Sequence, residues 1–140
     1  MLKYNTDLIE KYEGFKSRPY LCPAGVPTIG IGTTIYPDGR GVTLFDPEIT
    51  LEEARMYLRH HISTQILPIL LKYRLNLNVN QNSALISFCY NCGTAPLRKI
   101  ISKGKVDWER MKLYNKSKGK VLPGLTKRRQ EEYELSQRPV

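Results

Sequence analysis

The sequence lacks a long apolar segment: no run among its 140 residues approaches the ~20 apolar residues that a helix needs to span a bilayer. Its first residues, 1–7, also lack the apolar core of a secretory signal peptide. These absences predict a protein without a membrane span that is made in the cytoplasm. We expect it to reach any target outside the cytoplasm only after release or delivery by other proteins.

Cysteine is scarce and odd in number, with Cys22, Cys89 and Cys92 as the only three. An odd number argues against a dedicated disulfide framework. Cys89 and Cys92 form a single Cys-x-x-Cys pair, and the adjacent His60 and His61 would leave a helix about 100° apart. We therefore expect no metal site and no cofactor, and we expect Cys89 and Cys92 to be small apolar side chains of a buried helix.

Acidic residues are outnumbered, with 13 Asp and Glu against 22 Lys and Arg and a net charge of +9. A strongly basic surface attracts polyanions. The sequence contains no helix-turn-helix, zinc finger or other nucleic-acid recognition motif, so we expect no nucleic-acid partner and favour attraction to an anionic cell envelope. The hydrophobic content of 41% is ordinary for a soluble globular protein, and we expect one domain, residues 1–140, and a monomer.

The stretch from residue 13 to residue 34 holds the most informative pattern. Apolar residues before it recur at roughly helical spacing, at Leu2, Leu8, Ile9 and Tyr12. They predict a short helix with Glu13 at its C-terminal end, and the residues Thr28–Thr34 predict short, tightly turned strands. A carboxyl group at such an apolar junction has a raised pKa and can act as a general acid. A solvated glutamate at a helix end is the alternative.

Glu13, Cys22 and Thr28 are separated by eight and five residues. This spacing resembles the catalytic signature of the phage-type lysozymes and endolysins (glycoside hydrolase family 24), in which the middle position is aspartate or cysteine. Two later stretches agree with the same family. Residues 81–93 resemble its central buried helix, and residues 122–132 resemble its C-terminal Gly-Leu-x-x-Arg-Arg-x-x-Glu helix. The motifs occur in the family's order and cover nearly the whole chain.

The resemblance implies a fold of the α+β class that is predominantly α, the lysozyme-like fold. A small β-hairpin lobe is expected at about 14–48, a linking helix at about 51–67, and a larger helical lobe at 76–140 together with the N-terminal helix. The two lobes are expected to flank a cleft.

The implied activity is hydrolysis of the β-1,4 bond between N-acetylmuramic acid and N-acetylglucosamine in bacterial peptidoglycan. Glu13 would be the general acid, and Cys22 and Thr28 would position the attacking water. A thiol with an ordinary pKa of about 8.5 is mostly neutral at pH 7, so Cys22 is expected to be a weaker base than a carboxylate. Most of the catalysis is therefore assigned to Glu13.

The resemblance also assigns binding residues. Tyr20 and Thr34 are expected to bind the substrate from the β lobe, and Tyr90 and Asn91 from the end of the central helix. Core packing is the equal alternative for Tyr90. One basic residue of the C-terminal segment, Arg128 or Arg129, is expected to lie beside Glu13 and to lower its pKa, and two surface charges are the alternative.

Local signals predict the remaining elements. Thr50 and Glu53 form a capping box that begins a helix, which Pro68 ends or kinks. Further expectations are an extended run at 42–45, an N-cap at Asn80, a helix over 94–102, a helix over 108–114 capped by Asp107, and a last helix from about Leu125. Asp38, Asp46 and Glu48 are expected to be turn and cap residues, although each could serve as an outlying second carboxylate.

Two readings from other classes remain beside the hydrolase. A lytic transglycosylase also uses a single glutamate and leaves anhydro-muramic ends, and a wall-binding module could have lost catalysis. A nucleic-acid binder would rest on charge alone. The chemical form of the released products separates these readings.

Overall fold

The structure is a computed structural model that describes residues 2–140, and its chain forms two compact units. The strand unit comprises Ile9–Gln65, and the helical unit comprises the residues up to Leu8 together with Ile66–Val140. Within the described residues, no helix is both long enough and apolar enough to cross a membrane.

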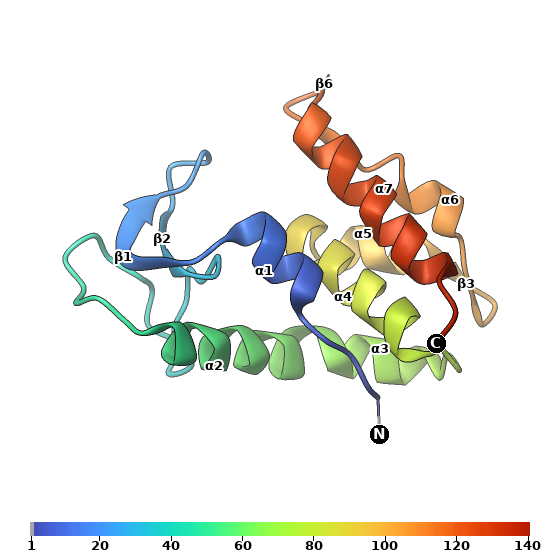
Figure 1. The fold of residues 1–140 in the computed structure, drawn as a ribbon, viewed down its shortest axis with the longest axis horizontal. Helices are drawn as coiled ribbons and strands as arrows, with labels where there is room; N and C mark the ends of the chain where they lie inside the picture. The colour runs from blue at the N-terminus through green and yellow to red at the C-terminus, as the bar shows by residue number, and fades with distance from the viewer. Residues whose placement is uncertain (1) are drawn as a thin grey trace. The chain divides into compact units, whose positions relative to one another are not determined.

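The strand unit contains most of α1 (Asp7–Glu13), the strands β1 (Lys16–Leu21) and β2 (Pro27–Gly30), and α2 (Leu51–His61) (Figure 1). The two strands pair antiparallel, with Tyr20 opposite Thr28 and a shift in register between Lys16 and Tyr20. The predicted short helix followed by a small β-ribbon is confirmed.

The capping box at Thr50 and Glu53 is also confirmed. The Thr50 hydroxyl accepts the backbone N–H of Glu53 at 3.1 Å, and the Glu53 carboxylate accepts the backbone N–H of Thr50 at 3.1 Å. α2 then packs against β2, where buried Ala54 lies directly beside Gly30. This contact fixes the strand pair on the helix.

A long loop joins β2 to α2, and the extended run predicted at 42–45 is wrong. Asp46 is the cause, because its carboxylate accepts the backbone N–H of Thr43 at 2.9 Å and the Thr43 hydroxyl at 2.7 Å. These bonds turn the chain at residues 44–46 and take a donor that a strand ladder would need. The Tyr36 hydroxyl and Arg40 complete the carboxylate's contacts, at 2.7 and 3.2 Å.

The helical run that starts with α2 does not end at Pro68. It passes through a π-helical turn, η1 (Ile62–Ile66), into α3 (Leu67–Tyr73). Pro68 stands in the first turn of α3 and has no N–H to bond to the turn before it. The π-helical irregularity lies in that preceding turn, so the helix is interrupted next to the proline but does not end there.

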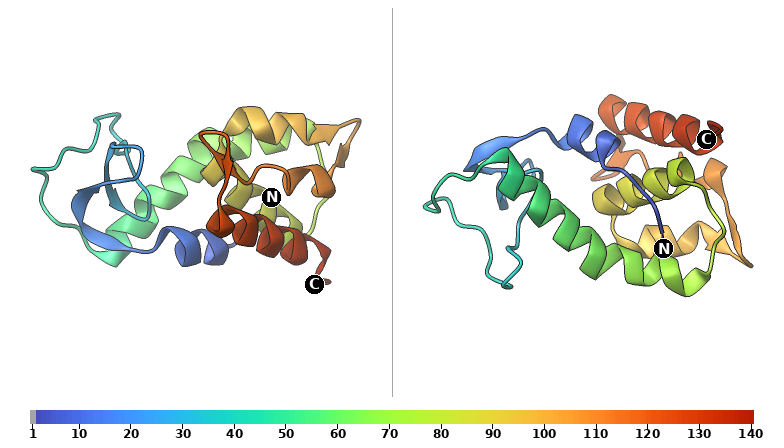
Figure 2. Two further views of the ribbon diagram at one scale, coloured as in Figure 1. Left: turned by 90° about the horizontal axis from the view of Figure 1, so that it is seen from above. Right: turned by 60° about the horizontal axis from the view of Figure 1, so that its bottom comes forward.

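The helical unit is built around α4 (Val79–Cys92), whose residues from Asn82 to Cys89 are all buried. α4 packs against α7 (Pro123–Gln137) and α5 (Thr94–Lys99), and α6 (Trp108–Met111) packs against α7 (Figures 1 and 2). The predicted buried central helix is confirmed. Asn80 is not its N-cap: Asn78 and Gln81 form a reciprocal capping box at 2.8 and 3.0 Å, so the helix begins earlier.

Two short hairpins follow helices that end earlier than predicted. β3 (Ile101–Ser102) pairs with β4 (Lys105–Val106), so the helix expected over 94–102 ends at Lys99. β5 (Lys116–Ser117) pairs with β6 (Lys120–Val121), after α6 has ended at Met111. Asp107 caps α6 as predicted, by accepting the Arg110 N–H at 3.0 Å.

The two hairpins share the sequence Ser-Lys-Gly-Lys-Val and the same register. Each turns through a lysine and a glycine with positive φ, 51° at both Lys103 and Lys118 and 74° and 80° at Gly104 and Gly119. Figures 1 and 2 place the hairpins at different ends of the helical unit. All four of their turn residues are exposed.

Candidate active site

Glu13 is the last residue of α1 and is half-buried. The helix stops there because Gly14 follows with a φ of 68°, a conformation that glycine adopts readily at helix ends. The Gly14 N–H still bonds to the Glu10 carbonyl at 3.0 Å. Glu13 is thus held at a defined end of a helix, as the sequence predicts.

Cys22 lies in the turn between β1 and β2, where its N–H bonds to the Val26 carbonyl at 3.1 Å and its carbonyl accepts the Gly25 N–H at 2.8 Å. A hydrogen bond from the Val26 backbone is the main cause that lowers the pKa of the Cys22 thiol, and bonds from the Ala24 backbone and Thr28 side chain add to it. Cys22 therefore ionises more readily than an ordinary thiol, which its residue type alone does not predict.

Thr28 is 3% exposed and lies opposite Tyr20 in the strand pair. Its hydroxyl donates to the Val26 carbonyl at 2.8 Å. A hydroxyl carries a single proton, so a bond from Thr28 to an ionised Cys22 requires that proton to turn away from Val26. Thr28 can in this way respond to the charge of the neighbouring thiol.

Tyr20 connects these groups electrostatically. Burial is the main cause that raises the pKa of its hydroxyl, and the negative charges of Glu13 and Cys22 raise it further. The ring is half-buried, with the Lys16 ammonium 5.3 Å from its centre. The charges of Glu13 and Cys22 therefore both act on Tyr20, and Cys22 in turn is in hydrogen-bond reach of Thr28.

Thr34 belongs to the loop that follows. It is exposed, and its carbonyl accepts the Val42 N–H at 2.9 Å. In the helical unit, Tyr90 is half-buried and Asn91 is exposed at the C-terminal end of α4. Substrate binding by Thr34, Tyr90 and Asn91 stays a prediction.

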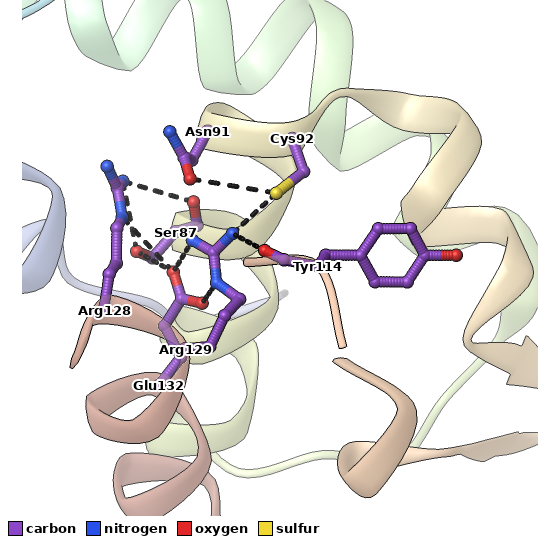
Figure 3. Close-up of polar contacts among 7 residues, drawn as sticks. All are labelled: Ser87, Asn91, Cys92, Tyr114, Arg128, Arg129 and Glu132. Carbon is purple, nitrogen blue, oxygen red and sulfur yellow. Dashed lines mark hydrogen bonds and ion pairs between the residues drawn. The ribbon is translucent and has the colours of Figure 1, made fainter. Parts of the chain in front are cut away.

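Arg128 and Arg129 are buried, at 3% and 1% exposure, so they are not surface charges. Arg129 donates two hydrogen bonds to the Glu132 carboxylate, at 2.6 and 3.1 Å, and one to the Tyr114 carbonyl at 3.2 Å. Arg128 donates to the backbone carbonyl and the hydroxyl of Ser87 at 3.3 Å (Figure 3). Both arginines thus join α7 to the rest of the helical unit, and the predicted proximity to Glu13 stays a prediction.

Glu132 and Cys92 have roles in this cluster that the sequence analysis did not assign, since it named Glu132 only as the last residue of the C-terminal motif and Cys92 only as an apolar core residue. Glu132 has no exposed surface and also accepts the Ser87 hydroxyl at 2.6 Å. The spacing Arg128, Arg129 and Glu132 signals contacts along one helix face, but composition gives no sign that these charges are buried. Cys92 receives a hydrogen bond from Arg129 at 2.6 Å, a role that its expected apolar character does not suggest.

Metal-binding geometry is absent from the part of the chain that the structure describes. Among residues 2–140, no three His, Cys, Asp or Glu side chains lie together in a way that could hold an ion. The predicted site residues of the strand unit supply a carboxyl group, a thiol, a phenol and a hydroxyl, from Glu13, Cys22, Tyr20 and Thr28.

Comparison with known proteins gives the family. Residues 10–132 match the sequence model described as phage lysozyme. The chain belongs to the phage lysozyme family. It is therefore a peptidoglycan hydrolase of the glycosidase type, and the family suggested by the three motifs is confirmed.

Individual relatives agree over almost the whole length of this phage lysozyme. An endolysin of Acyrthosiphon pisum secondary endosymbiont phage 1 is 33% identical, with 91% of each chain covered. A SAR-endolysin of Haemophilus phage HP1 is 30% identical, with 91% of this chain and 76% of the relative covered. The solved endolysin of Escherichia coli O157:H7 phage FAHEc1 superposes with a TM-score of 0.81 at 29% identity, over 94% of this chain and 89% of the other. The lysozyme-like α+β fold is thereby confirmed.

Proposed function

We propose that this phage lysozyme is a muramidase that hydrolyses the β-1,4 bond between N-acetylmuramic acid and N-acetylglucosamine, with Glu13 as the general acid. Glu13 donates a proton to the leaving glycosidic oxygen. The observation that carries the proposal is the placement of Glu13 at the end of α1, where its charge acts on Tyr20, the residue on which the charge of Cys22 also acts. A rigid helix end keeps the acid in one position relative to the bond.

Cys22 and Thr28 position the water that attacks the sugar. An inverting glycosidase usually provides a second carboxylate for this task. Asp46 is unsuited to it, because Thr43, Tyr36 and Arg40 already occupy its carboxylate oxygens. The Cys22 thiol has a lowered pKa and stands beside the Thr28 hydroxyl, so this pair offers both a proton acceptor and a hydrogen-bond partner for water.

Four further residues contact the glycan in this proposal. Tyr20 and Tyr90 offer aromatic faces to sugar rings, and Thr34 and Asn91 offer hydrogen-bonding groups. Asn91 is exposed, which leaves its amide accessible to a ligand. The enzyme acts as a monomer.

The first experiment is mass spectrometry of the muropeptides released from purified peptidoglycan by the native protein and by Glu13→Gln. The native protein is expected to release reducing muramic ends, and Glu13→Gln is expected to release none. Glu10→Gln is the matched control, because Glu10 belongs to the same helix but pairs with Arg55 at 3.0 Å. Anhydro-muramic ends would show that the protein is a lytic transglycosylase and not a hydrolase. If the native protein released no products, a wall-binding module without catalysis would be the best account.

The second experiment compares Cys22→Ser, Cys22→Asp and Thr28→Val by the same assay. Cys22→Ser and Cys22→Asp are expected to keep most of the activity, because each retains a group that hydrogen-bonds water. Thr28→Val removes the hydroxyl and is expected to lower the rate about 10²-fold, the order of loss that follows when a reacting group is misplaced. Complete loss of activity in Cys22→Ser would show that the Cys22 thiol, and not Glu13 alone, is essential for catalysis.

A further inference from the structure

We propose that Cys92 is a positioning residue, which holds the side-chain amide of Asn91 so that its NH₂ group faces the glycan. The inference rests on the proposed function, because it assumes that Asn91 contacts the substrate. It concerns a thiol that the catalytic signature does not include. Its geometric basis lies entirely within the helical unit.

The Cys92 sulfur occupies the middle of a hydrogen-bond chain. Arg129 donates to it at 2.6 Å, and the Cys92 thiol donates to the Oδ1 atom of Asn91 at 3.7 Å. Figure 3 shows the sulfur between the guanidinium and the amide. The chain joins a buried cation to an exposed amide through one atom.

The buried end of this chain is fixed. Arg129 is 1% exposed, is held by the Glu132 carboxylate at 2.6 Å and by the Tyr114 carbonyl at 3.2 Å, and lies 5.1 Å from the centre of the Phe88 ring. A guanidinium has planar donors in fixed directions, so these partners also set the direction of the donor that reaches Cys92. The position of the sulfur is defined in turn.

A protonated thiol suits both contacts, because it has one proton to donate and lone pairs to accept. Burial is the main cause that raises the pKa of Cys92, although the positive charge of Arg129 opposes the rise. The thiol therefore keeps its proton at neutral pH. A thiolate could accept from Arg129 but could not donate to Asn91.

The bond to Oδ1 decides which half of the amide is available. With the oxygen turned to Cys92, the nitrogen of Asn91 points away from the sulfur, as Figure 3 shows. The exposed group is then a donor of two hydrogen bonds. It suits an acceptor oxygen of the glycan, such as the carbonyl of an N-acetyl group.

The test is a double-mutant cycle on kcat and KM with soluble peptidoglycan fragments. Cys92→Ala is expected to lower kcat/KM about three- to tenfold, mainly through KM, the effect of one net hydrogen bond. Cys92→Ser is expected to stay within about twofold of the native value, since a hydroxyl also donates and accepts. When Asn91 is already alanine, Cys92→Ala is expected to change kcat/KM less than about twofold.

The control for the loss of a thiol is Cys89→Ala. Cys89 is 2% exposed and lies on the same helix, so its replacement perturbs packing without touching Asn91. Three results would overturn the inference: the same loss from Cys92→Ala with and without Asn91, no advantage of serine over alanine, or full activity of Asn91→Ala. Either of the first two results would show that Cys92 serves only in packing. The third would show that Asn91 does not contribute to substrate binding.

A readout independent of activity separates this inference from the proposed function. The side-chain amide signals of Asn91 in a ¹⁵N–¹H spectrum are expected to shift in Cys92→Ala and to stay near the native positions in Cys92→Ser. Unchanged signals in both variants would show that the thiol does not hold the amide, whether or not the protein hydrolyses peptidoglycan. Inactive native protein with the expected shifts would instead overturn the hydrolase while leaving the hydrogen-bond chain in place.

Discussion

Ser87 donates a hydrogen bond of 2.6 Å to Glu132, a carboxylate with no exposed surface. The bond joins the middle of α4 to α7, the two helices that form the core of the helical unit. Glu132 also pairs with Arg129 at 2.6 Å and with Arg128 at 3.4 Å, so one acid compensates two buried cations. A charge cluster, and not apolar contact alone, defines how these helices meet.

Glu132→Gln is expected to lower the free energy of unfolding by about 3–5 kcal/mol, because it leaves two buried guanidiniums without a counter-charge. Urea denaturation followed by circular dichroism measures the change. Glu134→Gln on the same helix is the control, since Glu134 is exposed and its loss should cost less than about 0.5 kcal/mol. Equal losses in the two variants would show that the buried pairs contribute no more than a surface charge.

The sequence predicted this fold well where short signals act locally. The capping box at Thr50 marks the start of α2 correctly, and the spacing of Glu13, Cys22 and Thr28 identifies the family. The same capping logic also marks Asn78, two residues before the predicted cap at Asn80, because Gln81 follows at the required spacing. The sequence therefore contained the correct signal for the start of α4, and the prediction overlooked it.

Other features depend on partners that are distant in the sequence. Nothing local shows that Arg129 is buried, since arginine is almost always exposed unless it is paired. The lowered pKa of Cys22 likewise comes from backbone groups that only the folded turn directs at the sulfur. The β3–β4 hairpin was missed because its turn is Lys-Gly, and hairpins of this type usually signal themselves with Asn-Gly or Asp-Gly.

Gly30→Ala is expected to destabilise the strand unit for two separable reasons. Gly30 has a φ of 67°, and an added Cβ would lie 3.0 Å from the Cβ atom of Ala54 and 3.1 Å from Ile49. Backbone strain costs about 1–2 kcal/mol, and overpacking costs a further ~1–3 kcal/mol. Gly39→Ala isolates the strain, because Gly39 has a φ of 90° and open space around it. Equal melting temperatures of the two variants would mean that α2 shifts to accommodate the added methyl group and that the overpacking does not destabilise the protein.

Cys22 is expected to be the first cysteine alkylated by iodoacetamide in the native protein. Its pKa is lowered chiefly by the Val26 backbone, so its labelling rate should reach half-maximum at a lower pH than that of an ordinary thiol. Burial raises the pKa of Cys89 to about 12, and its 2% exposure further protects it. Peptide mass spectrometry across pH measures both sites.

Thr28→Val provides the control for that labelling. It removes a hydrogen bond to the Cys22 sulfur, so the midpoint of Cys22 labelling is expected to move to higher pH while Cys89 is unaffected. An unchanged midpoint would show that the turn backbone alone sets the pKa of Cys22. Cys89 labelled as fast as Cys22 would contradict the burial of the α4 core.

Asp46 makes the stability of the strand unit depend on pH in the acidic range. The Thr43 N–H is the main cause that holds the pKa of its carboxyl below the usual range, and the Tyr36 hydroxyl contributes next. Because the folded pKa is depressed, the stabilisation is fully present above the ordinary value of about 4 and is lost as the pH falls below it. The free energy of unfolding should therefore fall more steeply in acid for the native protein than for Asp46→Asn. Asp38→Asn, which removes an equal charge from the same loop, is the control, and parallel curves for Asp46→Asn and the native protein would contradict the assignment.

The twin hairpins give the last prediction. Lys103 and Lys118 both adopt a φ of 51°, a conformation that costs most residues about 1–2 kcal/mol but suits asparagine. Lys103→Asn and Lys118→Asn are each expected to raise the free energy of unfolding by about 0.5–1 kcal/mol. Lys105→Asn removes the same charge at a strand position of the same hairpin, so it should bring no such gain. If all three variants behaved alike in thermal denaturation, the gain would come from reduced charge repulsion in this basic protein and not from the relief of backbone strain.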